Sequence, residues 1–118
     1  MSNKAIVSFG EIMCRLASPG NLRLRQTRAL EVTYAGAEAS VAASICNFGG
    51  QARYVTALPK HALAEATMDT LRAVGIDTQY ILRPDTGRLG LYFLETGANQ
   101  RPSNVIYDRA DSAVSLTP

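Results

Sequence analysis

The chain has 118 residues, of which 47% are hydrophobic and 19% are charged. This length suits one domain, or a piece of one, and leaves no room for two independent hydrophobic cores, while the apolar share excludes disorder throughout. Twelve Lys and Arg residues against ten Asp and Glu residues give a formal net charge of +2, too small and too dispersed to bind a nucleic-acid backbone.

The apolar stretches are short. None approaches the roughly 20 residues that a membrane-spanning helix needs, and the stretch after Lys4 is too brief for the core of a signal peptide. We therefore expect a cytoplasmic protein that has neither a membrane nor a nucleic acid as partner. Cys14 and Cys46 lie in apolar settings without metal-ligand spacing, so we expect buried thiols and no metal site.

The first third of the chain predicts extended structure. Residues 4–9 are almost continuously apolar, which indicates a strand covered on both faces. Residues 12–16 can continue as a second extended piece, which the turn signal at 18–21 ends. From 22 to 34 apolar and polar residues alternate, which predicts half-exposed antiparallel strands.

Two helices are expected in the middle of the chain. Residues 36–50 predict an amphipathic helix of small residues with an apolar stripe at Val41, Ile45 and Phe48. Residues 61–74 predict a second helix. Its apolar side consists of Leu63, Thr67, Leu71 and Val74.

Further strands are expected at 53–58 and 76–83, so that strands and helices alternate as in a parallel α/β layer with right-handed crossovers. Residues 89–95 and 103–109 then predict a hairpin joined across 96–102. Together with 12–34, this hairpin would form a second, smaller antiparallel sheet.

The last predicted strand carries the first candidate chemistry. Side chains alternate along a strand, so Tyr107 and Arg109 share one face, and Tyr92 on the neighbouring strand can join them. Arginine binds carboxylates through a bidentate fork and tyrosine offers a ring face and a hydroxyl, so the set suits a polyhydroxylated acid. The alternative is a cross-strand aromatic pair beside a solvated arginine.

A second candidate is Gly36 at the entrance of the first predicted helix. Glycine lets the backbone approach a ligand closely, and a helix N-terminus favours anions and oxygen-rich groups, although an isolated glycine more often means only a tight turn. No nucleotide-phosphate motif occurs in the chain. We expect His61 to be solvated, and Glu11 and Arg15 stand after the first strand, where ligands of open α/β sheets collect.

Several motifs recur in a familiar order. They are FGEIM (9–13), GAEASVA (36–42), TALP (56–59), GLYFLE (90–95) and RPSNVIYDRA (101–110). Over nearly its whole length the chain resembles the N-terminal part of ribokinase-like (PfkB-type) sugar kinases, and most closely the 2-keto-3-deoxygluconate kinases. This resemblance implies an α/β fold in which a small antiparallel β-sheet lid covers the sugar site.

By resemblance, residues 1–118 are the N-terminal part of a sugar kinase domain, with core pieces at about 4–10 and 36–84 and lid strands at about 12–34 and 89–109. The resemblance implies that Gly36 and the start of its helix contact the sugar and that Tyr92 and Tyr107 line the pocket. Arg109 would bind the carboxylate of an acidic sugar.

Three positions depart from the family pattern. Ala35 precedes Gly36 where the family usually has a glycine pair, and Ala64-Glu65 stands where Gly-Asp is common. Ser40 replaces an Asn that hydrogen-bonds the sugar. A hydroxyl reaches less far than an amide and offers a different donor pattern, so sugar preference can change at Ser40.

The resemblance also implies ATP and Mg2+ for the complete enzyme. The family's catalytic Asp lies in a downstream GAGD motif, so we expect no catalytic residue in this chain and no activity of the chain alone. The complete protein would phosphorylate 2-keto-3-deoxygluconate. Alternatives are a ribokinase- or fructokinase-type kinase of a neutral sugar, or a non-catalytic association module. Because family lids often pair between subunits, we also expect a homodimer through the lid sheet.

Overall fold

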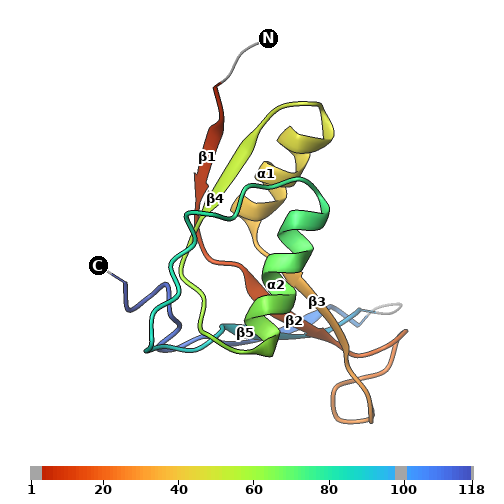
Figure 1. Cartoon of the computed structure of the whole chain (residues 1–118). Helices are drawn as coiled ribbons and strands as arrows, with labels where there is room; N and C mark the ends of the chain where they lie inside the picture. Colours follow the sequence, from red (N-terminus) through yellow and green to blue (C-terminus); the bar gives the residue numbers. More distant parts are fainter. Residues whose placement is uncertain (1–3, 98–100, 118) are drawn as a thin grey trace.

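The computed structural model describes residues 4–97 and 101–117. It consists of two sheets, with two helices packed beside the smaller one (Figure 1). Strands β1 (Ile6–Phe9) and β4 (Ala52–Val55) pair in parallel, with Ile6 opposite Ala52. The four strands of the other sheet, which we call the lid, lie in the order β3-β2-β5-β6. The α/β class with a second small sheet is therefore confirmed.

Helix α1 (Ala37–Asn47) contacts both strands of the β1–β4 layer. Its buried residues are Ala39 and Ala42 rather than the predicted stripe, and Phe48 is 87% exposed. Alanines allow the helix backbone to approach the strands closely, so the small face packs inward and the bulky face points outward. Of the predicted apolar stripe, Ile45 is partly buried and packs against the core, whereas the prediction was wrong for Val41 and Phe48, which are exposed.

Helix α2 (Ala62–Ala73) buries Ala64, Thr67, Met68 and Leu71. Thr67 and Leu71 belong to the predicted side, whereas Leu63 and Val74 are exposed. The helix begins at His61, whose Nδ1 accepts a hydrogen bond from the Ala64 N–H at 3.2 Å. His61 therefore caps a helix by satisfying one of the free N–H groups of its first turn.

The lid is a mixed sheet. Strands β2 (Met13–Ala17), β3 (Glu31–Ala35), β5 (Leu91–Glu95) and β6 (Asn104–Asp108) form two antiparallel pairs, but β2 and β5 run parallel, with Cys14 opposite Leu91. The predicted purely antiparallel sheet was wrong in this detail. Both strands start from the layer and point outward, so they enter the lid in the same direction (Figure 1).

Two predicted strands are not formed. Residues 76–83 pair only through isolated parallel bridges, Arg53 in β4 with Asp77 and Ala57 after β4 with Leu82. Between these bridges the Asp77 carboxylate accepts a hydrogen bond from the Gln79 N–H at 3.0 Å, which turns the chain away from the strand. Residues 22–29 form turns instead of a strand. In the predicted link at 96–102, residues 98–100 lie outside the described part of the chain.

One buried cluster joins the layer to the lid. It contains Tyr54 and Leu71 from the layer and its helices, and Ile12, Cys14 and Leu89 from the chain where it enters the lid. By contrast β1 is mostly exposed, with Phe9 at 67%, because among the described residues only β4 pairs with it. The expectation that this strand is covered on both faces was wrong.

Both cysteines are free thiols; Cys14 is buried, which raises its pKa, and Cys46 is half-buried. Among residues 4–97 and 101–117, no three His, Cys, Asp or Glu side chains could hold a metal ion together. Neither helix in this part of the chain has the length and apolar character needed to span a bilayer.

Candidate functional site

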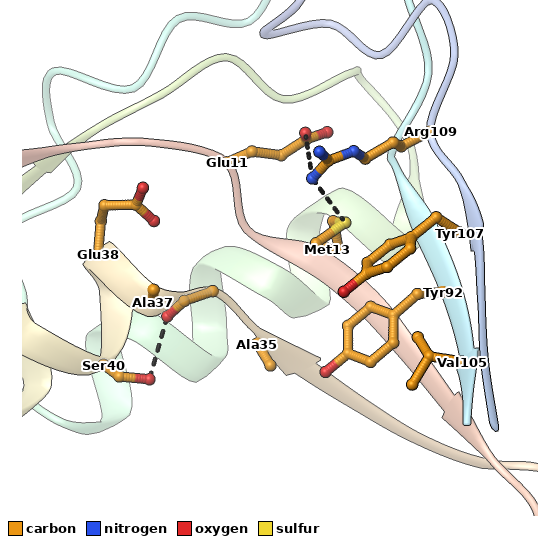
Figure 2. A pocket seen from close by; sticks show the side chains of 11 residues that line it. Glu11, Met13, Ala35, Ala37, Glu38, Ser40, Tyr92, Val105, Tyr107 and Arg109 are labelled. Carbon is orange, nitrogen blue, oxygen red and sulfur yellow. Dashed lines mark hydrogen bonds and ion pairs between the residues drawn. The ribbon is translucent and has the colours of Figure 1, made fainter. Parts of the chain in front are cut away.

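A cavity of about 510 Å³ lies between the lid and the start of α1 (Figure 2). It is lined by all five residues that the sequence singled out. These are Gly36, Ser40, Tyr92, Tyr107 and Arg109. The structure thus brings together side chains that lie far apart in the sequence, from the first turn of a helix and from two lid strands.

The two tyrosines form the lid side of the cavity. Tyr92 on β5 lies directly opposite Tyr107 on β6, and their ring centroids are 5.9 Å apart with the planes inclined by 39°. Both hydroxyls point toward the α1 side in Figure 2. Such a pair can cover the apolar face of a sugar while its hydroxyl groups donate or accept hydrogen bonds.

Arg109 follows β6 and reaches over the cavity mouth. Its guanidinium carbon lies 5.3 Å from the centroid of the Tyr107 ring, within the range of a cation–π interaction. Nη1 lies 3.9 Å from the Met13 sulfur and 3.8 Å from Glu11 Oε1. Within the described part of the chain, no oxygen accepts a hydrogen bond from this guanidinium, so its donors are available to a ligand.

Glu11 lies in the link between β1 and β2 and was noted in the sequence without a defined role. Its side chain is 19% exposed, and Oε2 is buried without a hydrogen-bond partner among the described residues. Oε2 lies so close to Gly90 that a Cβ atom at position 90 would stand 2.6 Å from it. A side chain at position 90 would therefore clash with the Glu11 carboxylate, and glycine avoids this clash.

The helix side of the cavity begins at Gly36, which is the N-cap of α1. A Cβ atom there would lie 2.5 Å from the Glu11 carbonyl oxygen, so glycine lets two links between layer and lid cross closely. The close approach that glycine permits is thus one between two parts of the chain itself.

The Ser40 hydroxyl donates to the Gly36 carbonyl at 3.0 Å (Figure 2). Because its proton is engaged, the Ser40 oxygen can only accept a hydrogen bond from a ligand. Where the resembled family has an Asn, whose side-chain amide can both donate and accept a hydrogen bond, Ser40 can therefore only accept one.

The sequence analysis missed six residues that line the cavity or left them without a role. They are Glu11, Met13, Ala35, Ala37, Glu38 and Val105. Val105 and Met13 follow from strand alternation, since they lie on the same face as Tyr107 and near Arg109. Glu38, in the first turn of α1, has the signal of an acidic residue at a helix N-terminus.

Neither of two other noted sites lines this cavity. Arg15 donates from Nη1 to the Thr33 hydroxyl at 3.4 Å across two lid strands. Ala64 and Glu65 stand where the resembled family commonly has Gly-Asp. Ala64 is fully buried, and Glu65 forms an ion pair with Arg83 at 2.7 Å. Both arrangements connect parts of the fold.

The cavity does not fit a nucleoside triphosphate. Its lining holds two carboxylates, Glu11 and Glu38, and one guanidinium, Arg109, and two carboxylates repel a polyanion. The chain also has no glycine-rich phosphate loop. The described residues therefore suit a hydroxyl-rich ligand with at most one carboxylate, and no phosphoryl-transfer step can be derived from them.

An α/β layer joined to a mixed sheet, with a cavity between them, is the arrangement that this chain shares with ribokinase-like kinases. The family model described as "pfkB family carbohydrate kinase" matches residues 3–118, and the chain belongs to this family.

The relatives and neighbours agree with this assignment. The chain is 41% identical over 110 residues to 2-dehydro-3-deoxygalactonokinase of Haloferax volcanii, covering 93% of this chain and 34% of the relative. The crystal structure of 2-dehydro-3-deoxygluconokinase from Thermotoga maritima superposes with a TM-score of 0.93 at 50% identity, covering 97% and 35% of the two chains. A PfkB family carbohydrate kinase from Listeria grayi gives a TM-score of 0.92 at 31% identity, covering 97% and 35%. The chain thus spans about a third of the length of these relatives.

Proposed function

We propose that this chain is the sugar-binding part of an ATP-dependent sugar kinase, and that the complete protein phosphorylates 2-keto-3-deoxygluconate or its galactonate epimer. The observation that carries the proposal is Arg109, whose donors face the cavity mouth without an oxygen partner among the described residues. The relatives named 2-dehydro-3-deoxygalactonokinase and 2-dehydro-3-deoxygluconokinase, in which 2-dehydro is another word for 2-keto, support the substrate class.

The lining gives the bound acid a direction. Its carboxylate would pair with Arg109, and its carbon chain would lie against Tyr92 and Tyr107. Its hydroxyl groups would face the α1 side, where Ser40 and Glu38 offer acceptors. A ligand with an anion at one end and several O–H donors at the other matches this division.

Calorimetric titration of the protein at its natural length with 2-keto-3-deoxygluconate and with fructose tests the proposal. We expect preference for the acid. Arg109→Met should weaken acid binding roughly 10- to 100-fold, since hydrogen bonds to charged groups contribute about 1.5–3 kcal/mol, and leave fructose binding almost unchanged. Equal or stronger fructose binding by the unchanged protein would contradict the acid assignment.

A kinase of a neutral sugar, such as a ribokinase- or fructokinase-type enzyme, is the second candidate. The pair of carboxylates in the lining favours it, because the negative charges of Glu11 and Glu38 oppose the binding of an anion. The same titration separates the two candidates, since only the acid requires Arg109.

Phosphoryl transfer would need Mg-ATP and a catalytic base, which we assign to a part of the complete protein outside these 118 residues. We therefore propose that the isolated chain transfers no phosphate and that the protein works in the cytoplasm. A coupled assay of ADP release, with the isolated chain and with the protein at its natural length, tests the first statement. Turnover by the isolated chain would contradict it.

We further propose a homodimer through the lid sheet. The lid face opposite the cavity carries a groove of about 480 Å³ whose apolar lining includes Leu24, Leu30, Phe93 and Ile106. A second copy covering this face would bury these side chains. Light scattering should show a dimer that Ile106→Asp dissociates; a monomer at every concentration would contradict the proposal. An isolated chain that dimerises without binding sugar would favour the non-catalytic association module.

A further inference from the structure

Arg109 has a more defined position than its exposure suggests. Its side chain is 54% exposed, and an exposed arginine ordinarily samples many rotamers, whose loss costs about 2 kcal/mol when the side chain is fixed. Three groups hold it over the cavity: the Tyr107 ring, the Met13 sulfur and the Glu11 carboxylate. Among the described residues, Glu11 supplies its only ion pair.

Glu11 is held in place independently of Arg109. The residues that follow it, Ile12 and Met13, are both buried, so the backbone is fixed at the junction of layer and lid. Its Oε2 is buried beside Gly90. The carboxylate is thus a fixed negative charge at the base of the lid, on one side of the guanidinium.

We propose that Glu11 is a positioning residue for Arg109, which holds the guanidinium over the cavity without using the donors that a ligand carboxylate needs. The inference rests on the proposed function, because it names the residue that prepares Arg109 for an acidic sugar.

The distance supports this role. At 3.8 Å the Nη1–Oε1 pair is longer than a hydrogen bond, so Glu11 orients the side chain without taking one of its N–H groups. Nη1 is the guanidinium nitrogen paired with Glu11, and the N–H groups of Nε and Nη2 form a planar fork. That fork can bind a carboxylate with two parallel hydrogen bonds.

Glu38 provides a matched control. It lines the same cavity and carries the same charge, but its side chain lies beside Gly10, where a Cβ atom would stand 2.7 Å from Oε2, and no ion pair joins it to Arg109. Removing either charge changes the electrostatics of the cavity, whereas only Glu11→Gln removes the charge that orients Arg109.

The experiment measures acid and fructose binding to the protein at its natural length and to its Glu11→Gln and Glu38→Gln variants. We expect Glu11→Gln to weaken acid binding about two- to fivefold, the range of an exposed ion pair, with fructose binding unchanged. In an Arg109→Met background the same substitution should have no effect on acid binding. Glu38→Gln should not reproduce this selective loss.

A second measurement does not depend on the sugar. The ¹⁵N order parameter of Arg109 Nε should fall below about 0.6 in Glu11→Gln, which is the range of a flexible group. Should that variant fail to fold, Glu11→Asp keeps the charge on a shorter side chain and should give a smaller change in the same direction.

Tighter or equal acid binding by Glu11→Gln, equal losses for acid and fructose, or an unchanged order parameter would each overturn the positioning role. Failure of the unchanged protein to prefer the acid would overturn the proposed substrate class instead. In that case the order parameter alone decides whether Glu11 positions Arg109.

Discussion

The β1–β4 layer and the lid each combine a buried strand with an exposed one, but of the two exposed strands only that of the lid carries ligand-facing side chains. In the layer, β4 alternates between buried and half-buried residues while β1 is mostly exposed. In the lid, β2 is largely buried whereas β6 is exposed along its whole length. The buried parts of both sheets meet in one cluster, and the ligand-facing groups lie on the exposed part of the lid. Stability and ligand binding are therefore carried by different residues.

The largest expected effect is in the shared cluster. Leu71 on α2 is 3% exposed, so Leu71→Ala should lower the free energy of unfolding by about 2–5 kcal/mol, measured in urea. Leu63→Ala, on the same helix at 47% exposure, is the control and should have a much smaller effect. Because the cluster joins layer and lid, both regions should unfold in one transition. Two separate unfolding transitions would show that the layer and the lid do not share one core.

The next effect lies where the two regions cross. Gly36→Ala places a Cβ atom 2.5 Å from the Glu11 carbonyl oxygen, and relieving such overpacking costs about 1–3 kcal/mol. The backbone shift should also displace Ser40 and weaken sugar binding. Chemical denaturation and titration of the same variant check both outcomes, with Val41→Ala, at an exposed position of α1 outside the cavity lining, as control. If Gly36→Ala weakened sugar binding without lowering stability, the close approach of Gly36 to the Glu11 carbonyl could not be the cause.

A smaller change of opposite sign is expected at Tyr54. Its ring is fully buried, and its hydroxyl has no hydrogen-bond partner among the described residues. Burial and the nearby carboxylates of Glu38 and Glu11 raise its pKa, so the hydroxyl stays protonated. Tyr54→Phe removes an unsatisfied polar group and should stabilise the fold by about 1 kcal/mol in thermal unfolding. Destabilisation would reveal a partner such as a buried water.

The smallest effect is expected at the lid edge. Arg88 donates a hydrogen bond to Asp108 at 2.7 Å, which holds the pKa of this exposed carboxyl below its usual range. A lowered folded-state pKa contributes stability above the unfolded-state value of about 3.9, and this contribution is lost as the pH falls through the lowered pKa. Asp108→Asn should therefore lower the Tm slightly at pH 7.

The pH dependence of this difference is the sharper test. The gap in Tm between the unchanged protein and Asp108→Asn should stay constant above about pH 5 and close in the acid range below about pH 4. Added salt should reduce the gap at pH 7, because the pair is exposed. A gap that widens toward low pH would contradict the assignment.

Local patterns predicted much of this architecture, and the misses have physical causes. The parallel α/β layer, the second sheet and the grouping of Tyr92, Tyr107 and Arg109 follow from apolar runs and strand alternation. Gly36 follows from its place at a helix entrance, and the family resemblance adds Ser40. The inward face of α1 did not follow, because close packing favoured Ala39 and Ala42 over larger apolar residues.

The remaining misses depend on tertiary structure. The parallel pairing of β2 with β5 depends on where the chain leaves the layer, which no local pattern contains. The position of Glu11 beside Arg109 requires two segments from opposite ends of the chain to meet. The Asp77 turn, which keeps residues 76–83 from forming a continuous strand, is a local signal that the alternation of apolar residues concealed.

The pairing of β2 with β5 also sets an order of events in folding. The hairpins β2–β3 and β5–β6 each join strands that follow one another in the chain, whereas the pairing of Cys14 with Leu91 closes a long loop between them. Such non-local contacts form slowly, because the entropy of loop closure must be overcome first. The cavity takes residues from Glu11 to Arg109. During synthesis, therefore, the growing chain cannot assemble this cavity until Arg109 has emerged from the ribosome.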